Sequence, residues 1–120
     1  MVTPGLGPGV DAALGRGLPV LAGVLTPTDV IAADAAGATA LKVFPASAVG
    51  GPAYLRALLG PFPGLPFVPV GGVDATAAAE YLELGAVAVG VGSPLVGDAA
   101  DGGDLDGLRR RAGRFVAVCE

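Results

Sequence analysis

Short and almost uniformly apolar segments recur along the chain, and each leads through a glycine-containing turn into a helical stretch. The four clearest are LPVLA at 18–22, TALKV at 39–43, PFVPV at 66–70 and AVAVGV at 86–91, and VTPGLGPG at 2–9 resembles the tail of another strand. A strand with one face in water alternates polar and apolar residues, and these show little alternation. The order of strands and helices therefore predicts a parallel sheet covered by helices.

The helix ends are signalled by their own residues. Thr26 can cap a helix that begins at Pro27, with Asp29 at the capping-box position and Gly37 at the end. Asp74 can cap a second helix that ends at Gly85. Further helical stretches are predicted at 11–16, at 50–60 and from 104 onward, the last with an apolar stripe of Leu105, Leu108, Ala112, Phe115 and Cys119 and an outer, solvated face that includes Arg109, Arg110 and Arg111.

Lys42 is the sole lysine and lies inside an apolar strand. With a period of two, Ala40, Lys42 and Phe44 point to one side of that strand, and Leu41 and Val43 to the other. An amine in apolar surroundings has its charged form disfavoured, and a neutral lysine can attack a carbonyl to form a Schiff base. A lysine that extends its ammonium to solvent, or pairs it, is the structural alternative.

The residue composition and net charge argue against several classes of function. The chain has 120 residues, the length of one domain, and contains no histidine, which argues against triad hydrolysis and zinc catalysis. A net charge of −4 argues against a nucleic-acid or anionic-membrane partner. Cys119 has no partner for an intramolecular disulfide, and proline and glycine interrupt every apolar run. A cytoplasmic protein without a metal, a cofactor or a membrane span is expected.

The glycines distinguish two parallel-sheet folds. A dinucleotide-binding open sheet has G-x-G-x-x-G after its first strand, which is absent here. Instead, glycines follow the last two predicted strands, as Gly71–Gly72 and as Gly92–Ser93. A (β/α)8 barrel forms its phosphate site from the loops after strands seven and eight, so the pattern favours a barrel.

The sequence resembles the class I aldolases that act on 2-keto-3-deoxy-6-phosphogluconate (KDPG) and 4-hydroxy-2-oxoglutarate (KHG). The matching pieces span nearly the whole chain: TPGL at 3–6, PVLAGVLTPTD at 19–29, LKVFPAS at 41–47, PFVPVGGV at 66–73 and GVGSPLV at 90–96. The resemblance implies a TIM barrel of which this chain is the C-terminal half, strands five to eight with the end of strand four, as one partial domain truncated at its N-terminus.

The resemblance also implies roles for individual residues. Lys42 would form the Schiff base, Pro4 and Phe44 would be pocket walls, and the backbone amides and hydroxyl of Gly71, Gly72, Gly92 and Ser93 would bind a phosphate. The substrate would be a small keto acid that is cleaved to pyruvate and an aldehyde. The resemblance also implies a homo-oligomer, because members of this family form trimers.

Three departures leave alternatives open. The family's proton-shuttling glutamate lies in a segment like EVTLR, which this chain lacks; Val70 replaces a threonine, and Leu25 is bulkier than the family's residue. Slow turnover is therefore expected of the isolated chain. The alternatives are a non-catalytic half-barrel that binds phosphate or serves in assembly, and a synthase acting on thiamine or indole intermediates.

Overall fold

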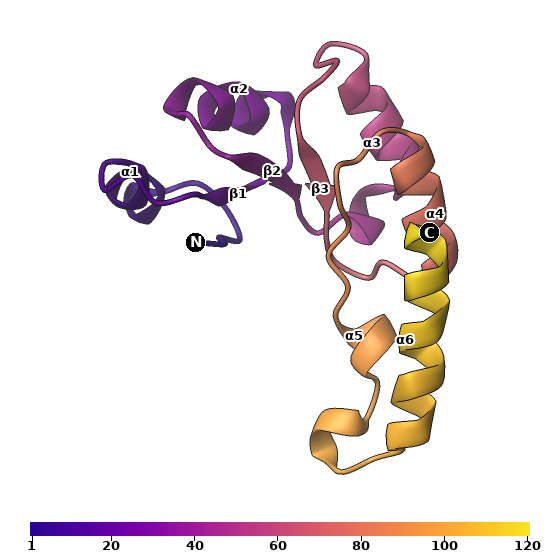
Figure 1. The fold of residues 1–120 in the computed structure, drawn as a ribbon. Helices are drawn as coiled ribbons and strands as arrows, with labels where there is room; N and C mark the ends of the chain where they lie inside the picture. The colour runs from indigo at the N-terminus through magenta and orange to yellow at the C-terminus, as the bar shows by residue number, and fades with distance from the viewer.

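The computed structural model describes residues 1–120 as an α/β fold with one small sheet (Figure 1). The strands are β1 (Leu21–Val24), β2 (Ala40–Val43) and β3 (Phe67–Pro69). The helices are α1 (Pro8–Leu14), α2 (Pro27–Ala36), α3 (Pro52–Leu59), α4 (Ala75–Glu83), α5 (Ser93–Val96) and α6 (Leu105–Cys119), with short 3-10 turns η1 (Ser47–Val49) and η2 (Ala99–Asp101).

The sheet is parallel, as the apolar strands predicted, with the order β1-β2-β3. The register places Lys42 beside Gly23 on one side and beside Val68 on the other. An isolated parallel bridge extends each edge, from Val2 to Leu21 and from Val70 to Gly90. The segment around Val2 thus continues the sheet, as the VTPGLGPG segment predicted.

The two faces of the sheet differ in burial. Leu41 and Val43 of β2 are each 1% exposed and belong to the hydrophobic core beneath the helices, whereas Ala40, Lys42 and Phe44 are half-buried on the opposite face. We call this second side the inner face. Val68 lies on it as well but is buried, because Lys42 flanks it in register and the 86–90 segment runs along its other side.

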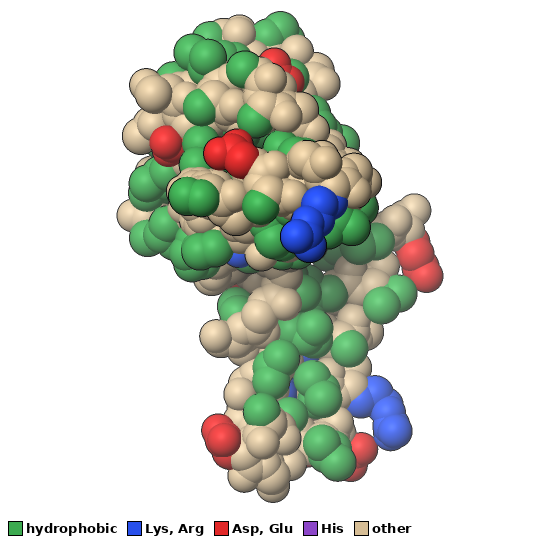
Figure 2. Space-filling view, turned by 90° about the vertical axis from the view of Figure 1, so that its left-hand side faces the viewer, with side chains coloured by type: hydrophobic (Ala, Val, Ile, Leu, Met, Phe, Trp, Pro, Cys, Tyr) green, Lys and Arg blue, Asp and Glu red, His purple; other side chains and the backbone are tan.

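The inner face is open over much of its area. A groove of about 370 Å³ runs along it, lined mainly by apolar residues: Met1, Val2, Pro19, Val20, Leu21, Thr39, Ala40, Val68 and Ala88. The radius of gyration is 15.1 Å, against about 13.6 Å for a compact domain of this length. Figure 2 shows why: a smaller lobe, made of α5, η2 and the start of α6, projects from the larger one.

The first helix and the first strand start at other residues than the sequence predicted. Helix α1 begins at Pro8, earlier than the predicted 11–16 turn, because proline fits the first helical position. Strand β1 covers 21–24 instead of 18–22, since Pro19 has no N–H for a ladder and its carbonyl accepts from the amino group of Met1, at 2.6 Å.

The predicted strand at 86–91 is absent, and the reason lies in its neighbour. Val87 N–H donates to the Phe67 carbonyl, and Gly90 N–H donates to the Pro69 carbonyl. The two donors are three residues apart and the two acceptors only two, so the register of a regular ladder is not kept. Pro69 itself has no N–H to return. The segment is therefore held by two hydrogen bonds and one bridge but forms no regular ladder.

The inner stripe of α6 also differs from the predicted one. Leu105 is 68% exposed and Cys119 is exposed, whereas Gly107 is buried and Arg111 is half-buried on the packed side. The predicted outer face is thus correct for Arg109 and Arg110 but wrong for Arg111. No helix in the structure combines the length and the apolar character that a membrane span requires.

Helix α2 begins as predicted. Thr26 Oγ1 accepts a hydrogen bond from the Asp29 N–H, the Asp29 carboxylate accepts from the N–H groups of Thr26 (2.8 Å) and Leu25 (3.0 Å), and Gly37 ends the helix with φ of +86°. The hydrogen bond from Thr26, followed by that from Leu25, outweighs burial and holds the pKa of Asp29 below its usual value of 3.8.

We expect Asp29→Ala to lower the free energy of unfolding by about 1 kcal/mol at pH 7. A carboxyl group with a lowered pKa stabilises the fold above the unfolded-state pKa, and this contribution is lost as the pH falls through the folded-state pKa. The difference between wild type and variant should therefore shrink below about pH 4 in urea titrations. Asp34→Ala, an exposed site on the same helix, is the control; equal losses in both variants would contradict the capping argument.

Candidate active site

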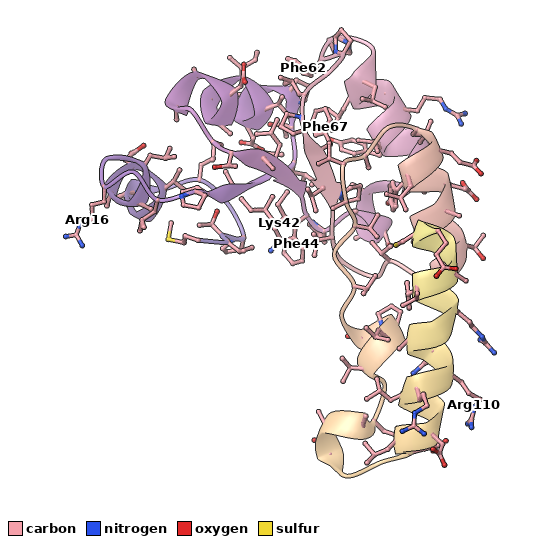
Figure 3. All side chains as sticks on the ribbon, viewed as in Figure 1. Arg16, Lys42, Phe44, Phe62, Phe67 and Arg110 are labelled. Carbon is pink, nitrogen blue, oxygen red and sulfur yellow. The ribbon has the colours of Figure 1, made fainter.

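Lys42 projects from the inner face of the sheet. In Figure 3 its side chain and that of Phe44 leave the sheet on the side away from α2. The Lys42 ammonium lies 4.6 Å from the centre of the Phe44 ring, a favourable cation–π distance. No hydrogen bond or ion pair joins Lys42 to a carboxylate, so its amine is available to a ligand.

The backbone of Pro4 lies against the neighbouring strand, over Gly23. Gly23, the register partner of Lys42, has the Pro4–Gly5 peptide directly over the position where a side chain would begin. Gly23 N–H donates to Thr3 Oγ1 at 3.0 Å and so fixes the segment in place. Gly23 lies just beyond the predicted strand at 18–22 but inside the observed strand β1, where a glycine allows close backbone approach.

Phe44 connects Lys42 to the first glycine pair. A Cβ placed on Gly71 would lie 3.2 Å from the Phe44 ring and 3.1 Å from Pro45 Cα, so the aromatic ring packs against a bare backbone. Gly71 and Gly72 have φ of +102° and +69°, values that favour glycine. The two glycines are therefore required both by conformation and by space.

In the Gly71–Gly72 turn both carbonyls accept hydrogen bonds, and the Gly72 amide is free. Ser47 N–H donates to the Gly71 carbonyl and Ser47 Oγ to the Gly72 carbonyl, at 3.1 and 2.8 Å. The N–H group of Gly72 makes no hydrogen bond within the chain, whereas that of Gly71 faces Gly90 in the Val70–Gly90 bridge. Ser47, which was not among the predicted site residues, thus anchors the turn while the Gly72 amide stays open to an acceptor.

Gly92 and Ser93 follow the neighbouring parallel segment. Their N–H groups and the Ser93 hydroxyl also have no partner within the chain. Residues that follow both turns line one cavity of about 130 Å³: Asp74 and Ala75 after the first turn and Pro94 after the second. The bridge between Val70 and Gly90 holds the two segments together just before these turns.

This arrangement combines an unpaired amine with two sets of free backbone donors. An amine on an apolar sheet face can add to a carbonyl carbon, and convergent N–H groups can bind an anion. Two carboxyl groups have a lowered pKa, and both lie at helix starts: Asp29 at α2, where it accepts from backbone N–H groups, and Asp104 before α6, where it pairs with Arg110. The structure places no carboxylate beside Lys42 that could move a proton for it.

Comparisons with known proteins find similarity to aldolases. The family model described as KDPG and KHG aldolase matches residues 1–110. A probable 2-dehydro-3-deoxy-6-phosphogalactonate aldolase of Rhizobium meliloti is 40% identical over 114 residues, which are 93% of this chain and 52% of that protein. The KHG/KDPG aldolase of Escherichia coli K12 is 35% identical over 117 residues, 96% of this chain and 55% of that protein.

The solved structures include a crystal structure described as the 4-hydroxy-2-oxoglutarate aldolase/2-deydro-3-deoxyphosphogluconate aldolase from TTHB1. It superposes with a TM-score of 0.82 and 40% identity, and the match covers 99% of this chain and 57% of that one. The chain thus spans about half the length of the curated relatives it matches.

Proposed function

Because the chain belongs to the KDPG and KHG aldolase family, we propose that it carries the Schiff-base half of a class I aldolase, with Lys42 as the nucleophile. The observation that carries the proposal is the position of Lys42: the sole lysine lies unpaired on the inner face, beside Phe44 and in register with Gly23. The substrates would be KDPG, cleaved to pyruvate and glyceraldehyde 3-phosphate, or KHG, cleaved to pyruvate and glyoxylate.

The reaction would start when Lys42 Nζ adds to the C2 carbonyl of the keto acid and water leaves, which gives an iminium ion. The C4 hydroxyl loses its proton, the C3–C4 bond breaks, and the electron pair moves into the iminium to form an enamine while the aldehyde leaves. Protonation at C3 and hydrolysis then release pyruvate and restore the amine. Phe44 would support the cationic stages, because its ring lies 4.6 Å from Nζ.

For a phosphorylated substrate, the turns at Gly71–Gly72 and Gly92–Ser93 would bind the phosphoryl group, through the free amides of Gly72, Gly92 and Ser93. Backbone N–H groups in glycine turns form such anion sites without a side chain in the way. The unphosphorylated KHG would not use them, so the same turns would set the substrate preference.

The proposal extends to the fold. We interpret the parallel sheet, with helices on one face and a groove on the other, as an arc of a (β/α)8 barrel, one partial domain over 1–120. In a closed barrel the rest of the wall would cover the inner face and supply the group that moves protons. Oligomerisation of the kind the family resemblance implies belongs to the same proposal.

The test is pyruvate release by the purified chain, measured with KDPG and with KHG. We expect slow release, because general acid–base catalysis contributes roughly 100- to 10,000-fold and no carboxylate lies beside Lys42. The control is the KHG/KDPG aldolase of Escherichia coli assayed in parallel. Release at the rate of that relative would contradict the absence of a proton-moving group.

The open inner face and the missing carboxylate favour one other candidate, a non-catalytic unit that binds phosphorylated compounds. In that case phosphorylated keto acids would raise the melting temperature, while neither pyruvate release nor a covalent lysine adduct would be observed. A melting temperature raised by pyruvate together with an adduct would exclude this candidate.

A further inference from the structure

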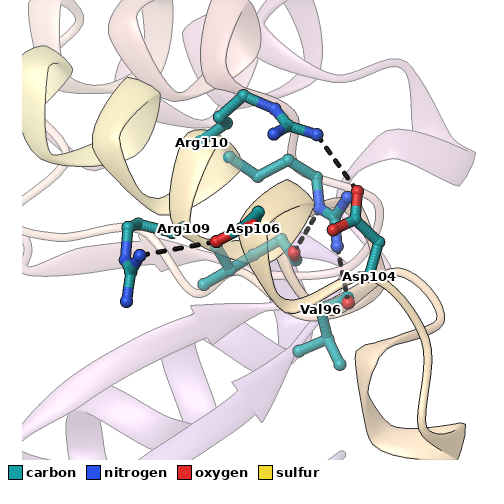
Figure 4. A network of polar contacts seen from close by, with 7 residues as sticks. Val96, Asp104, Asp106, Arg109 and Arg110 are labelled. Carbon is teal, nitrogen blue, oxygen red and sulfur yellow. Dashed lines mark hydrogen bonds and ion pairs between the residues drawn. The ribbon is translucent and has the colours of Figure 1, made fainter.

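Three consecutive arginines on α6 have different surroundings. Arg109 and Arg110 form ion pairs in solvent, with Asp106 at 3.4 Å and Asp104 at 3.0 Å, and their side chains are 86% and 66% exposed. Arg111 instead turns toward α5: its Nε donates to the Leu95 carbonyl at 2.7 Å and an Nη to the Val96 carbonyl at 2.9 Å. Figure 4 shows the two solvent pairs, Arg109 with Asp106 and Arg110 with Asp104, and a dashed line that ends at Val96 beside them.

These two bonds act on the carboxyl end of α5. The last carbonyls of a helix have no partner within it, and a cation near them is favourable. Helix α5 has four residues, too few to be stable alone. Its position therefore depends on contacts with α6, of which the Arg111 bonds are the polar ones.

The surroundings leave space for this guanidinium. A Cβ on Gly97 would lie 2.8 Å from an Arg111 Nη, and a Cβ on the buried Gly107 would lie 3.1 Å from the other. Gly97 after α5 and Gly107 on α6 thus leave room for the Arg111 guanidinium, where a larger side chain would collide with it. Arg111 also lines the 130 Å³ cavity with Asp74 and Pro94, which follow the two glycine turns in the chain.

We propose that Arg111 is a positioning residue for phosphate recognition. It holds α5, and α5 begins at Ser93, so Arg111 fixes the Gly92–Ser93 amides, which follow the segment bridged to Val70 just before the Gly71–Gly72 turn. The inference rests on the proposed function, because it takes the Gly71–Gly72 and Gly92–Ser93 turns as the phosphate site. It predicts that Arg111 affects phosphorylated ligands selectively.

The experiment compares wild type, Arg111→Met and Arg111→Lys, with Arg110→Met as the matched control. Lys42 is trapped with borohydride at increasing concentrations of KDPG and of pyruvate, and the half-saturating concentration is measured for each. We expect Arg111→Met to raise this concentration about ten-fold or more for KDPG and less than about two-fold for pyruvate. Arg111→Lys keeps the charge but lacks the planar guanidinium that binds both carbonyls, so a smaller rise in the half-saturating KDPG concentration is expected. Arg110→Met should not raise it.

The outcomes separate the two proposals. If wild type traps pyruvate and saturates with KDPG at lower concentration, but both Arg111 variants keep that preference, the positioning role is wrong and the aldolase proposal stands. If the variants lose affinity for pyruvate and KDPG equally, Arg111 has a general structural role and the inference is also wrong. If wild type traps neither compound, the proposed function and the inference fail together. Should Arg111→Met not fold, Arg111→Lys decides by the same comparison.

Discussion

Substitution of Lys42 by arginine or methionine is expected to reduce pyruvate release to the rate measured without protein. Arginine retains a charge over the Phe44 ring, but a guanidinium cannot be deprotonated in a protein and so cannot add to a carbonyl. Methionine retains the apolar stem and loses the amine. No second lysine exists that could take over, because Lys42 is the sole lysine of the chain.

Melting temperatures of the two variants serve as the control that both remain folded. Lys42 makes no hydrogen bond or ion pair, so neither variant should unfold the chain, and the loss should be confined to chemistry. Retention of more than about a tenth of the wild-type rate in Lys42→Arg would mean that another group carries the reaction, since loss of the covalent step removes far more than that.

Substitution of Gly23 by alanine is expected to give the largest loss of stability. The added methyl group would overlap backbone atoms of Pro4 and Gly5, which cannot rotate away as a flexible side chain could. The segment at 1–5 would have to move outward, which would weaken its hydrogen bonds to the edge strand, Thr3 N–H to Leu21 and Gly23 N–H to Thr3 Oγ1. We expect a loss of about 1 to 3 kcal/mol in the free energy of unfolding, as for other overpacked sites.

Gly5→Ala is the control for this substitution, because a Cβ at Gly5 meets no atom within 4 Å and the residue lies on the same displaced segment. Thermal melting should show a drop of roughly 4 to 8 °C per kcal/mol for Gly23→Ala and little change for Gly5→Ala. Gly23 is the register partner of Lys42, so the yield of the pyruvate adduct should fall in the first variant as well. Equal melting temperatures in both variants would contradict the packing of Pro4 on Gly23.

Features set by neighbouring residues were predictable from the sequence. The cap of α2 depends on Thr26, Pro27 and Asp29, which are adjacent, and the structure contains every bond that this spacing implies. The same holds for Asp74, whose Oδ1 accepts from Ala77 N–H at 2.8 Å. The two faces of β2 followed directly from the period of two, so the placement of Lys42 and Phe44 on one side was also predicted correctly.

Features set by contacts between distant segments were not predictable. Whether 86–91 forms a strand depends on the hydrogen-bonding groups at the edge of β3, and Pro69 has no N–H to donate. The direction of Arg111 depends on unpaired carbonyls of α5, sixteen residues before it. Leu105 completes a helical stripe in the sequence, but α6 turns another side toward α4 and α5, and Leu105 remains 68% exposed.

The central claim is that Lys42 forms a Schiff base with a 2-keto acid, and the most direct measurement is the site of the borohydride-reduced pyruvate adduct, located by tandem mass spectrometry of the digested wild-type chain. The chain has two kinds of amine, Lys42 and the amino group of Met1, which donates a hydrogen bond to the Pro19 carbonyl. We predict one added pyruvate, on Lys42, with Met1 unmodified at the same pyruvate concentration. An adduct on Met1 alone, or no adduct on either amine, would contradict the claim.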